Sequence, residues 1–246
     1  MLQHKVKYNG ADITAEEIQP ILVSSDPNFR PSDVEVGGDG ALYVTDWHNA
    51  LIGHMQHNMR DPNRDHEHGR IYRVTYEGRP LVKPAKMKGK PIAEVCENFL
   101  KPEDSTRYRA RLELTGRDRN DINEQVSAWA KKLEIENAVH AQALLECLWV
   151  FEEQRLPDSN LLSLVFRAEE PKVRAAAIRT LGHWGEYGFK IDGWADLLSS
   201  AGRDESALVR AEALKAAVAF PGLASAEVIF EVATRPTDPE LNTVLN

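Results

Sequence analysis

The chain has 246 residues, of which 42% are hydrophobic, 28% charged and 7% aromatic, and its formal net charge is −8. This length suffices for one large or two modest domains, each with a buried core. The acidic balance argues against a general nucleic-acid or anionic-membrane binder, whose surface would be basic. No stretch approaches the roughly 20 apolar residues that a membrane-spanning helix needs. The start of the chain lacks the apolar core and the cleavage site of a signal peptide.

The first part of the chain, residues 1–77, has the pattern of extended strands. Residues 5–8 and 18–24 are expected as strands around a turn at Asn9-Gly10, with a short helix over residues 14–18 as the alternative. Residues 33–36, 41–46 and 70–76 alternate or are rich in β-forming side chains, and Gly-Gly-Asp-Gly at 37–40 predicts the tight turn between the first two of these. The three strands are typical of the inner part of one β-propeller blade. Residues 18–24 would then be the outer strand of a preceding blade.

A polar loop, residues 47–69, interrupts this blade between its second and third strands and holds five of the eight histidines. In propellers this connection lies on the face where ligands usually bind, and polar loops between rigid strands often carry function. The candidate residues of the loop for the ligand face are His54, His57, Arg60, Asp61, Asn63, Arg64, Asp65, His66 and His68.

Asp46, at the end of the second strand, and His48 are the candidate catalytic residues. The Asp46 carboxylate is equally suited to accepting backbone N–H groups of the loop, and Trp47 between them is expected to pack. Imidazole is a common ligand for zinc, copper and iron. His54 and His57 would share a face of a short helix, and His66 and His68 would point the same way in an extended segment. The spacing matches no known metal motif, so no metal site is assigned.

A second polar run, residues 61–65, supports a structural alternative for the loop. Asp and Asn side chains there can form turns with nearby N–H groups, and Arg60 or Arg64 can clamp a carboxylate that braces the loop against the blade. On this interpretation the loop histidines bond to backbone groups or cap turns rather than contact a substrate.

Residues 78–93 are rich in proline and lysine and are expected as a solvated linker. From residue 94 to 246 the apolar period becomes helical, and a repeat opens at Val139, Val173 and Val209, with spacings of 34 and 36 residues. An echo at residues 109–112 lies in a helix expected near 103–115. Small alanines beside the repeated valine let paired helices pack closely, as in HEAT or armadillo-type solenoids.

Other residues of this helical part are expected to be structural. His140 occupies the arginine position of its repeat and is expected on a helix surface, and His183 is expected at a helix C-terminus. The two cysteines, Cys96 and Cys147, are expected to be buried, and no CxxC or CxxCH motif occurs. Four tryptophans at helical spacing are expected in the core: Trp129, Trp149, Trp184 and Trp194.

The fold class expected is therefore α+β with segregated parts: an antiparallel propeller-blade segment followed by an α-helical HEAT-like solenoid. Such a lone blade exposes two sheet edges and an apolar face that need a partner.

The strings GHMQH, RDPNRD and HGRIYRV, followed by VRAAAIRTLGHW, carry a resemblance that covers nearly the whole chain. The chain resembles the last propeller segment and the HEAT region of the large PVC-type membrane-bound dehydrogenase-like proteins of planctomycetes and verrucomicrobia. The resemblance implies a propeller similar to quinoprotein glucose dehydrogenases, a PQQ-like quinone, and c-type haem electron transfer in the parent protein. It also implies a carbohydrate substrate and a periplasmic or cell-surface location.

The chain departs from that family by lacking most of the propeller, a CxxCH motif and an export signal, so we expect a partial chain or one module of a split protein. Its partners would be the remaining blades and a cytochrome c domain, and the chain itself is expected to hold no cofactor. Two functions stay open. One is a fragment of a dehydrogenase, in which Asp46 or a loop histidine is the general base. The other is a non-enzymatic HEAT interaction module with a docking blade.

Overall fold

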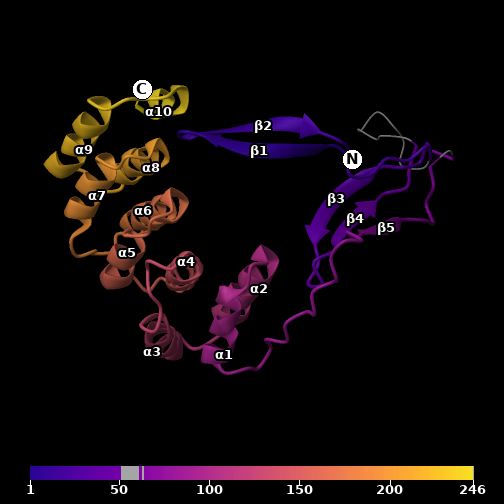
Figure 1. Ribbon diagram of the computed structural model, residues 1–246, viewed down its shortest axis with the longest axis horizontal. Coiled ribbons are helices and arrows are strands. Elements are labelled where there is room, and N and C mark those ends of the chain that lie inside the picture. Colours follow the sequence, from indigo (N-terminus) through magenta and orange to yellow (C-terminus); the bar gives the residue numbers. More distant parts are fainter. Residues whose placement is uncertain (51–60, 63, 246) are drawn as a thin grey trace. The chain divides into compact units, whose positions relative to one another are not determined.

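The computed structural model describes residues 1–50, 61–62 and 64–245, which form two compact units. One unit comprises residues 1–6 and 15–85, and the other comprises residues 7–14 and the chain from residue 86 onward. Figure 1 shows that the strands precede the helices along the chain. This order confirms the expected α+β class and the segregation of its parts, although a propeller is not shown.

The chain begins with a two-stranded hairpin, β1 (Gln3–Asn9) and β2 (Asp12–Ile18). Gly10 has a φ of +65°, which a glycine adopts without strain, so the turn after Asn9 is tight and the second strand begins at Asp12. The strand expected at residues 18–24 is therefore wrong, because the partner of β1 has already ended at Ile18. The alternative of a helix over residues 14–18 is wrong for the same reason.

A three-stranded antiparallel sheet follows, with the order β3 (Pro31–Val36), β4 (Leu42–Asp46) and β5 (Arg70–Val74). The predicted glycine turn joins β3 to β4: the Gly37 N–H donates to the Ala41 carbonyl at 2.9 Å, and Gly40 has a φ of +77°. The three strands expected from the sequence are thus confirmed. The last of them ends at Val74 rather than at Tyr76.

The register of this sheet separates an apolar face from a polar face. Val34 pairs with Val44 and Val44 with Tyr72, while Val36 pairs with Leu42. Directly paired residues share a face of an antiparallel sheet. The apolar face therefore carries Val34, Val36, Leu42, Val44, Tyr72 and Val74, and the polar face carries Asp33, Glu35, Tyr43, Thr45, Ile71 and Arg73.

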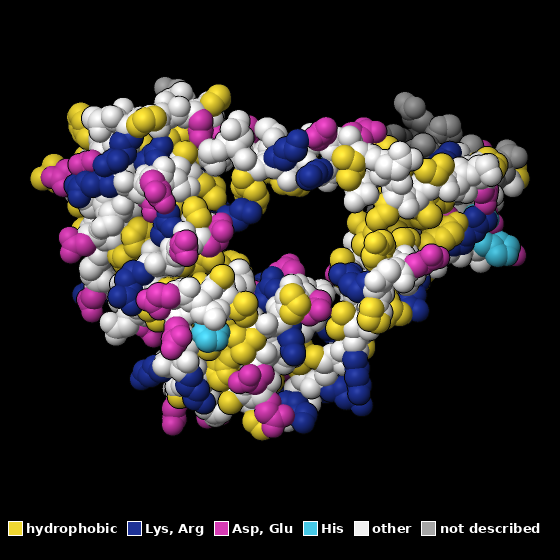
Figure 2. Space-filling model, viewed as in Figure 1, with side chains coloured by type: hydrophobic (Ala, Val, Ile, Leu, Met, Phe, Trp, Pro, Cys, Tyr) yellow, Lys and Arg dark blue, Asp and Glu magenta, His cyan; other side chains and the backbone are white. Residues whose placement is uncertain are grey.

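The part of this apolar face that lies on β3 is open to solvent. Val34 and Val36 are 46% and 47% exposed, and Figure 2 shows apolar side chains gathered over β3 and β4. Among the described residues of this unit, only Ala41 and Val44 are buried apolar side chains. The sheet therefore has almost no hydrophobic core of its own.

The helical unit begins after residues 75–91, a stretch without helix or strand in which Met87 is buried and all four lysines are exposed. Helices α1 (Ile92–Cys96) and α2 (Asp104–Thr115) flank the short 3-10 helix η1 (Glu97–Leu100). The remaining helices are α3 (Arg119–Ala130), α4 (Ala138–Glu153), α5 (Ser159–Val165), α6 (Pro171–Glu186), α7 (Trp194–Gly202), α8 (Ala207–Ala217), α9 (Leu223–Ala233) and α10 (Pro239–Leu245). In the described part of the chain, none of these helices is long and apolar enough to cross a membrane.

The helices pack as a repeat. Helices α2, α4, α6 and α8 contact one another in series and form what we call the inner layer (Figure 1). The predicted repeats open α4, α6 and α8, whose buried faces are rich in alanine and leucine. Gly182 in α6 permits close approach, since a Cβ there would lie 3.1 Å from the Cα of Ala216 in α8. The expected helical repeat is thus confirmed.

An arginine holds the turn before three of the inner helices. Its Nη1 donates to the carbonyls five and six positions earlier, at 2.7–2.9 Å, in Arg107 of α2, Arg174 of α6 and Arg210 of α8. The copy of the repeat that the sequence suggested at residues 109–112 is therefore placed two positions too late, because the equivalent arginine is Arg107 rather than Arg109. His140 takes the same place in α4, where its Nδ1 accepts from the Glu134 N–H at 3.3 Å.

The other structural expectations are confirmed for some residues and not for others. Cys96 and Cys147 are fully buried as predicted, and burial raises the pKa of the Cys96 thiol to about 12. Trp129 and Trp184 lie in the core, whereas Trp149 and Trp194 are only half-buried. His183 lies in the last turn of α6, as expected.

The arginine of the α6 repeat provides a test of this packing. Arg174 is 11% exposed and also donates from Nε and Nη2 to the buried Asp204 carboxylate at 2.8 and 2.9 Å. Replacing it with alanine removes both bonds to the two carbonyls and leaves the carboxylate with only the Ser206 N–H as a donor, so Arg174→Ala should lower the free energy of unfolding by about 2–4 kcal/mol. The change is measured by urea unfolding followed by circular dichroism.

The control is Arg203→Ala, because Arg203 is 51% exposed and pairs with Glu231 on the surface. Its loss should cost less than about 1 kcal/mol. Equal effects of the two substitutions would contradict the role given to Arg174.

Candidate functional site

The end of strand β4 is fixed by the Asp46 carboxylate, which is 3% exposed. Its Oδ1 accepts the backbone N–H groups of Arg30 and His48, both at 2.8 Å, and its Oδ2 accepts the Tyr72 hydroxyl at 3.2 Å. Burial acts to raise the pKa of Asp46, but these hydrogen bonds outweigh it and lower the pKa below its ordinary value. Asp46 is thus an ionised carboxylate that ties the segment before β3 and the turn after β4 to the strand. Its catalytic role stays a prediction.

Next to Asp46, His48 lies between a donor and an acceptor. The Nε2 of this 9% exposed histidine is 3.2 Å from Nη2 of Arg70 and 3.3 Å from Oδ2 of Asp65. Because a guanidinium only donates and a carboxylate only accepts, Nε2 can satisfy one partner at a time. An unprotonated Nε2 accepts from Arg70, and a protonated Nε2 donates to Asp65. The protonation of Nε2 thus decides which of the two neighbours His48 bonds to, and a catalytic role of His48 stays a prediction.

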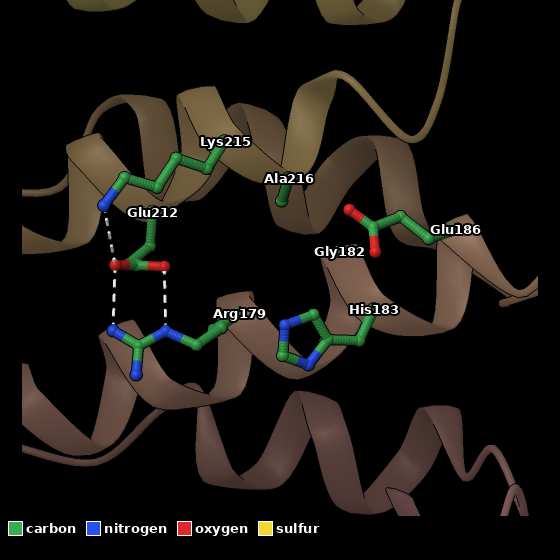
Figure 3. Close-up of a pocket in the computed structure, with 7 residues that line it drawn as sticks. All are labelled: Arg179, Gly182, His183, Glu186, Glu212, Lys215 and Ala216. Atoms are coloured by element: carbon green, nitrogen blue, oxygen red, sulfur yellow. Dashed lines mark hydrogen bonds and ion pairs between the residues drawn. The ribbon is translucent and has the colours of Figure 1, made fainter. Parts of the chain in front are cut away.

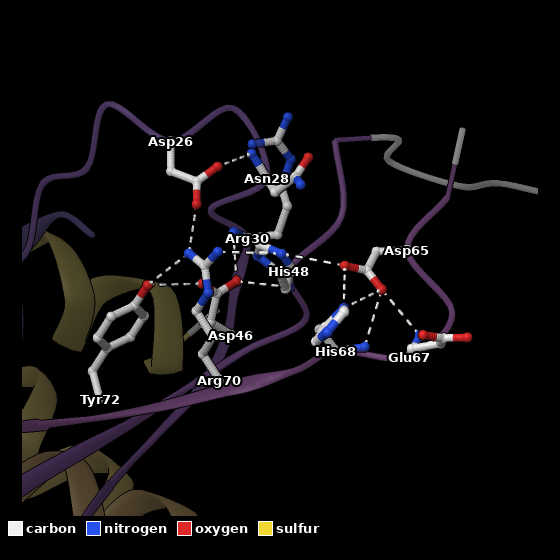
Figure 4. A network of polar contacts seen from close by, with 10 residues as sticks. All are labelled: Asp26, Asn28, Arg30, Asp46, His48, Asp65, Glu67, His68, Arg70 and Tyr72. Atoms are coloured by element: carbon white, nitrogen blue, oxygen red, sulfur yellow. Dashed lines mark hydrogen bonds and ion pairs between the residues drawn. The ribbon is translucent and has the colours of Figure 1, made fainter. Parts of the chain in front are cut away.

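Arg70, the first residue of β5, links this histidine to the chain before β3. Its Nη1 donates to Oδ2 of Asp26 at 2.6 Å and to the Tyr72 hydroxyl at 3.2 Å. The bonds to Tyr72 and to Asp26 raise the pKa of Arg70 above its ordinary value. Figure 4 shows Arg70 surrounded by Asp26, Tyr72, Asp46 and His48. We call these five residues, together with Asp65 as the sixth, the strand-end network.

Asp65 organises the last part of the loop. Its Oδ1 accepts the N–H groups of Glu67 and His68, both at 3.0 Å, and the Nδ1 of His68 lies 2.9 Å from its Oδ2. The bond from the Glu67 N–H is the largest of the influences that lower the pKa of Asp65 to about 2. The aspartate turn that the sequence suggested is present here.

The other described loop residues have separate roles. His66 does not share the partner of His68, because its Nε2 lies 3.3 Å from the carbonyl oxygen of Asp61 and the segment is not extended. Arg64 is buried, and its guanidinium carbon lies 5.9 Å from the centroid of the Trp47 ring. Trp47 is 52% exposed, so it packs against Arg64 at the surface rather than in a core.

The remaining loop candidates, His54, His57, Arg60 and Asn63, lie outside the described residues. In the residues that are described, no group of three or more His, Cys, Asp or Glu side chains is arranged to hold a metal ion.

A second polar site lies between α6 and α8, in a hollow of about 380 Å³ (Figure 3). On one side, Arg179 donates from Nε and Nη2 to both oxygens of Glu212, at 3.1 and 2.9 Å, and Lys215 donates to Oε1 at 3.3 Å. Glu212 is buried, which acts to raise its pKa, but the bonds from Arg179 and Lys215 lower it. The two cations and one carboxylate leave this side with a net charge of +1.

The opposite side of the hollow is acidic. Glu186 is exposed, and Figure 3 shows its carboxylate beyond the floor formed by Gly182 and Ala216. Within the described part of the chain, Glu186 makes no hydrogen bond or ion pair. We call this hollow, with its basic and acidic sides, the α6–α8 groove.

An adjoining hollow of about 450 Å³ lies between α4 and α6 and shares Arg179 and His183 with the groove. There the Glu152 carboxylate accepts the Thr180 hydroxyl at 2.6 Å and lies 2.5 Å from Nδ1 of His183. The guanidinium of Arg111 lies 4.8 Å from the centroid of the Trp149 ring. The inner layer thus presents charged and aromatic side chains along a continuous surface.

Sequence reasoning missed this inner-layer surface because single charges on helices usually indicate a solvated face. A usable signal was nevertheless present. Arg179 and Lys215 both stand six positions after the repeated valine of their helices, so two successive repeats place a cation at the same point.

Two known families match separate parts of the chain. Residues 1–78 match the family described as a domain of unknown function (DUF7133), and residues 159–245 match HEAT repeats. No curated protein and no solved structure matches the chain. The HEAT repeats expected from the sequence are confirmed over residues 159–245, and they support a repeat scaffold. The resemblance to dehydrogenase-like proteins stays a prediction, because neither match bears on it.

The low pKa of Asp65 leads to a pH test of the loop. A carboxyl whose pKa is about 2 in the folded chain, against an ordinary 3.8, stabilises the fold above pH 3.8 and loses this effect as the pH falls through 2. In an NMR titration, the amide signals of Glu67 and His68 should therefore shift with a midpoint near 2, and Asp65→Asn should abolish that shift. A midpoint near 4 would show that the two N–H bonds do not form.

Proposed function

We propose that the chain is a non-enzymatic HEAT-repeat interaction module whose N-terminal sheet completes a larger β-assembly of the propeller type. The observation that carries this proposal is the open apolar face of β3, β4 and β5. Val34 and Val36 are about half exposed, at 46% and 47%, opposite the fully buried Val44. An exposed apolar patch of this kind marks an interaction surface in a soluble protein.

The edges of the sheet favour further β-structure as the partner. Among the residues that the structure describes, strands β3 and β5 each pair on one side only, with β4. Every residue of β3 is exposed, so its backbone is accessible to another strand. The partner proposed is therefore the remaining blades of a propeller, from the same parent protein or from another chain, while the HEAT repeats supply a rigid support.

A dehydrogenase fragment is the second candidate, and the strand-end network favours it. His48 holds a ring nitrogen between Arg70 and Asp65 at the end of the sheet, on the connection where the resembling proteins carry their ligand face. In that case the missing blades would complete a sugar-oxidising site, with a quinone and c-type haem supplied by the parent, at a periplasmic or cell-surface location. The described residues favour the interaction module, because the Asp46 carboxylate is buried and both of its oxygens already accept hydrogen bonds from the chain.

The proposed docking face is tested with Val34→Thr/Val36→Thr. Threonine keeps the β-branched shape that strands favour but adds a hydroxyl to the apolar face. The fluorescence of an apolar dye such as anilinonaphthalene sulfonate, bound to the chain, should fall by roughly half. The thermal unfolding of the helices should not change.

The matched control is Asp33→Thr/Glu35→Thr, on the polar face of the same strand. Because this variant removes two carboxylates and the dye is an anion, it should bind at least as much dye as the natural chain. Equal dye binding by the natural chain and by Val34→Thr/Val36→Thr would contradict the proposed docking face.

A further inference from the structure

The α6–α8 groove has charges of opposite sign at its two ends, and each end can form further hydrogen bonds or ion pairs. Arg179 and Lys215 have side chains that are 53% and 52% exposed, although both already contact Glu212. Lys215 uses one of its three N–H groups within the described residues, and the Nη1 of Arg179 is not needed for the Glu212 pair. An additional carboxylate can thus bind at this end, and an additional cation at Glu186.

The distance between the two ends is set by helix α6. Arg179 and Glu186 are seven positions apart, which is close to two full turns, so both side chains lie on the same face. The rise of an α-helix places them about 10 Å apart along its axis. The floor between them, Gly182 and Ala216, has no long side chain, and the imidazole of His183 lines the groove between the two ends, so a chain lying across the floor passes beside it.

This spacing fits an extended peptide. In a polyproline II segment, residues i and i+3 project from the same side and are about 9 Å apart. In a β-strand, the residues on one side are about 7 or 13 Å apart, which fits the groove less well. A peptide with an acidic residue and a basic residue three positions apart therefore matches the two ends of the groove in both charge and distance.

We propose that the α6–α8 groove binds an extended partner segment that carries an acidic and a basic side chain three residues apart. The acidic side chain contacts Arg179 and Lys215, and the basic side chain contacts Glu186. The inference builds on the proposed role as an interaction module but concerns a surface separate from the β3–β5 face. Because dye binding at Val34 and Val36 requires no peptide, failure of one proposal is distinguishable from failure of the other.

The test uses the full chain and three fluorescein-labelled proline-rich peptides, with the core sequences Asp-Pro-Pro-Lys, Asp-Pro-Pro-Asp and Lys-Pro-Pro-Lys. Fluorescence anisotropy at low salt measures each Kd. The natural chain should bind the mixed peptide roughly tenfold more tightly than either of the others, since each of those places one like charge against the groove. Added salt should weaken this preference.

Charge reversal then tests the two ends separately. Glu186→Lys should change the preference to Asp-Pro-Pro-Asp, and Lys215→Glu should change it to Lys-Pro-Pro-Lys. Glu124→Lys is the matched control, because it makes the same charge change on an exposed position of α3, outside the groove, and should leave the ranking unaltered. Circular dichroism verifies that each variant is folded.

The proposal is overturned if the natural chain does not discriminate among the peptides, or binds none of them. It is also overturned if the rankings of the Glu186 and Lys215 variants match that of the natural chain.

Discussion

The unequal burial of apolar side chains is the constraint on which the rest of this structure depends. A three-stranded sheet has two faces and two edges, and it becomes stable when one face is packed against something else. Here the two β3 valines of that face, Val34 and Val36, remain half exposed, whereas the helices interleave leucine and alanine side chains into a continuous core. The helical repeat therefore has a hydrophobic core of its own, whereas the described residues of the sheet provide almost none.

Polar contacts partly replace the missing core of the sheet. Among the described residues of the first unit, buried polar or charged side chains (Asp46, His48, Asn49 and Arg64) outnumber the buried apolar ones. Such networks are directional, so they define the geometry of a strand end and its loop more sharply than apolar packing would. The strand-end network can thus serve either interpretation of the chain. In a docking blade it would hold the loop in place, and in a larger enzyme the same contacts would orient reactive groups.

The parts of the fold that could be predicted have strong local signals. The alternation of valine and charged residues around Gly37–Gly40 indicated β3 and β4, and the repeated valine indicated three inner helices. The second strand of the hairpin was placed six residues too late, because the tight turn at Gly10 left no sequence signal for where its partner should begin. The contacts of Asp46 were foreseen only as an alternative, since a carboxylate that holds backbone N–H groups and one that takes a proton look alike in sequence. The α6–α8 groove was not foreseen, because it arises from the juxtaposition of two repeats rather than from any single motif.

Hydrogen exchange of the full chain, followed by mass spectrometry, tests the central claim that the helical repeat is stable by itself while the sheet awaits a partner. We expect the amides of α4, α6 and α8 to be protected roughly a thousandfold more strongly than those of β3 and β5. Protection of β3 and β5 equal to that of α6 would contradict the account, because it would show that the sheet is already complete without further β-structure.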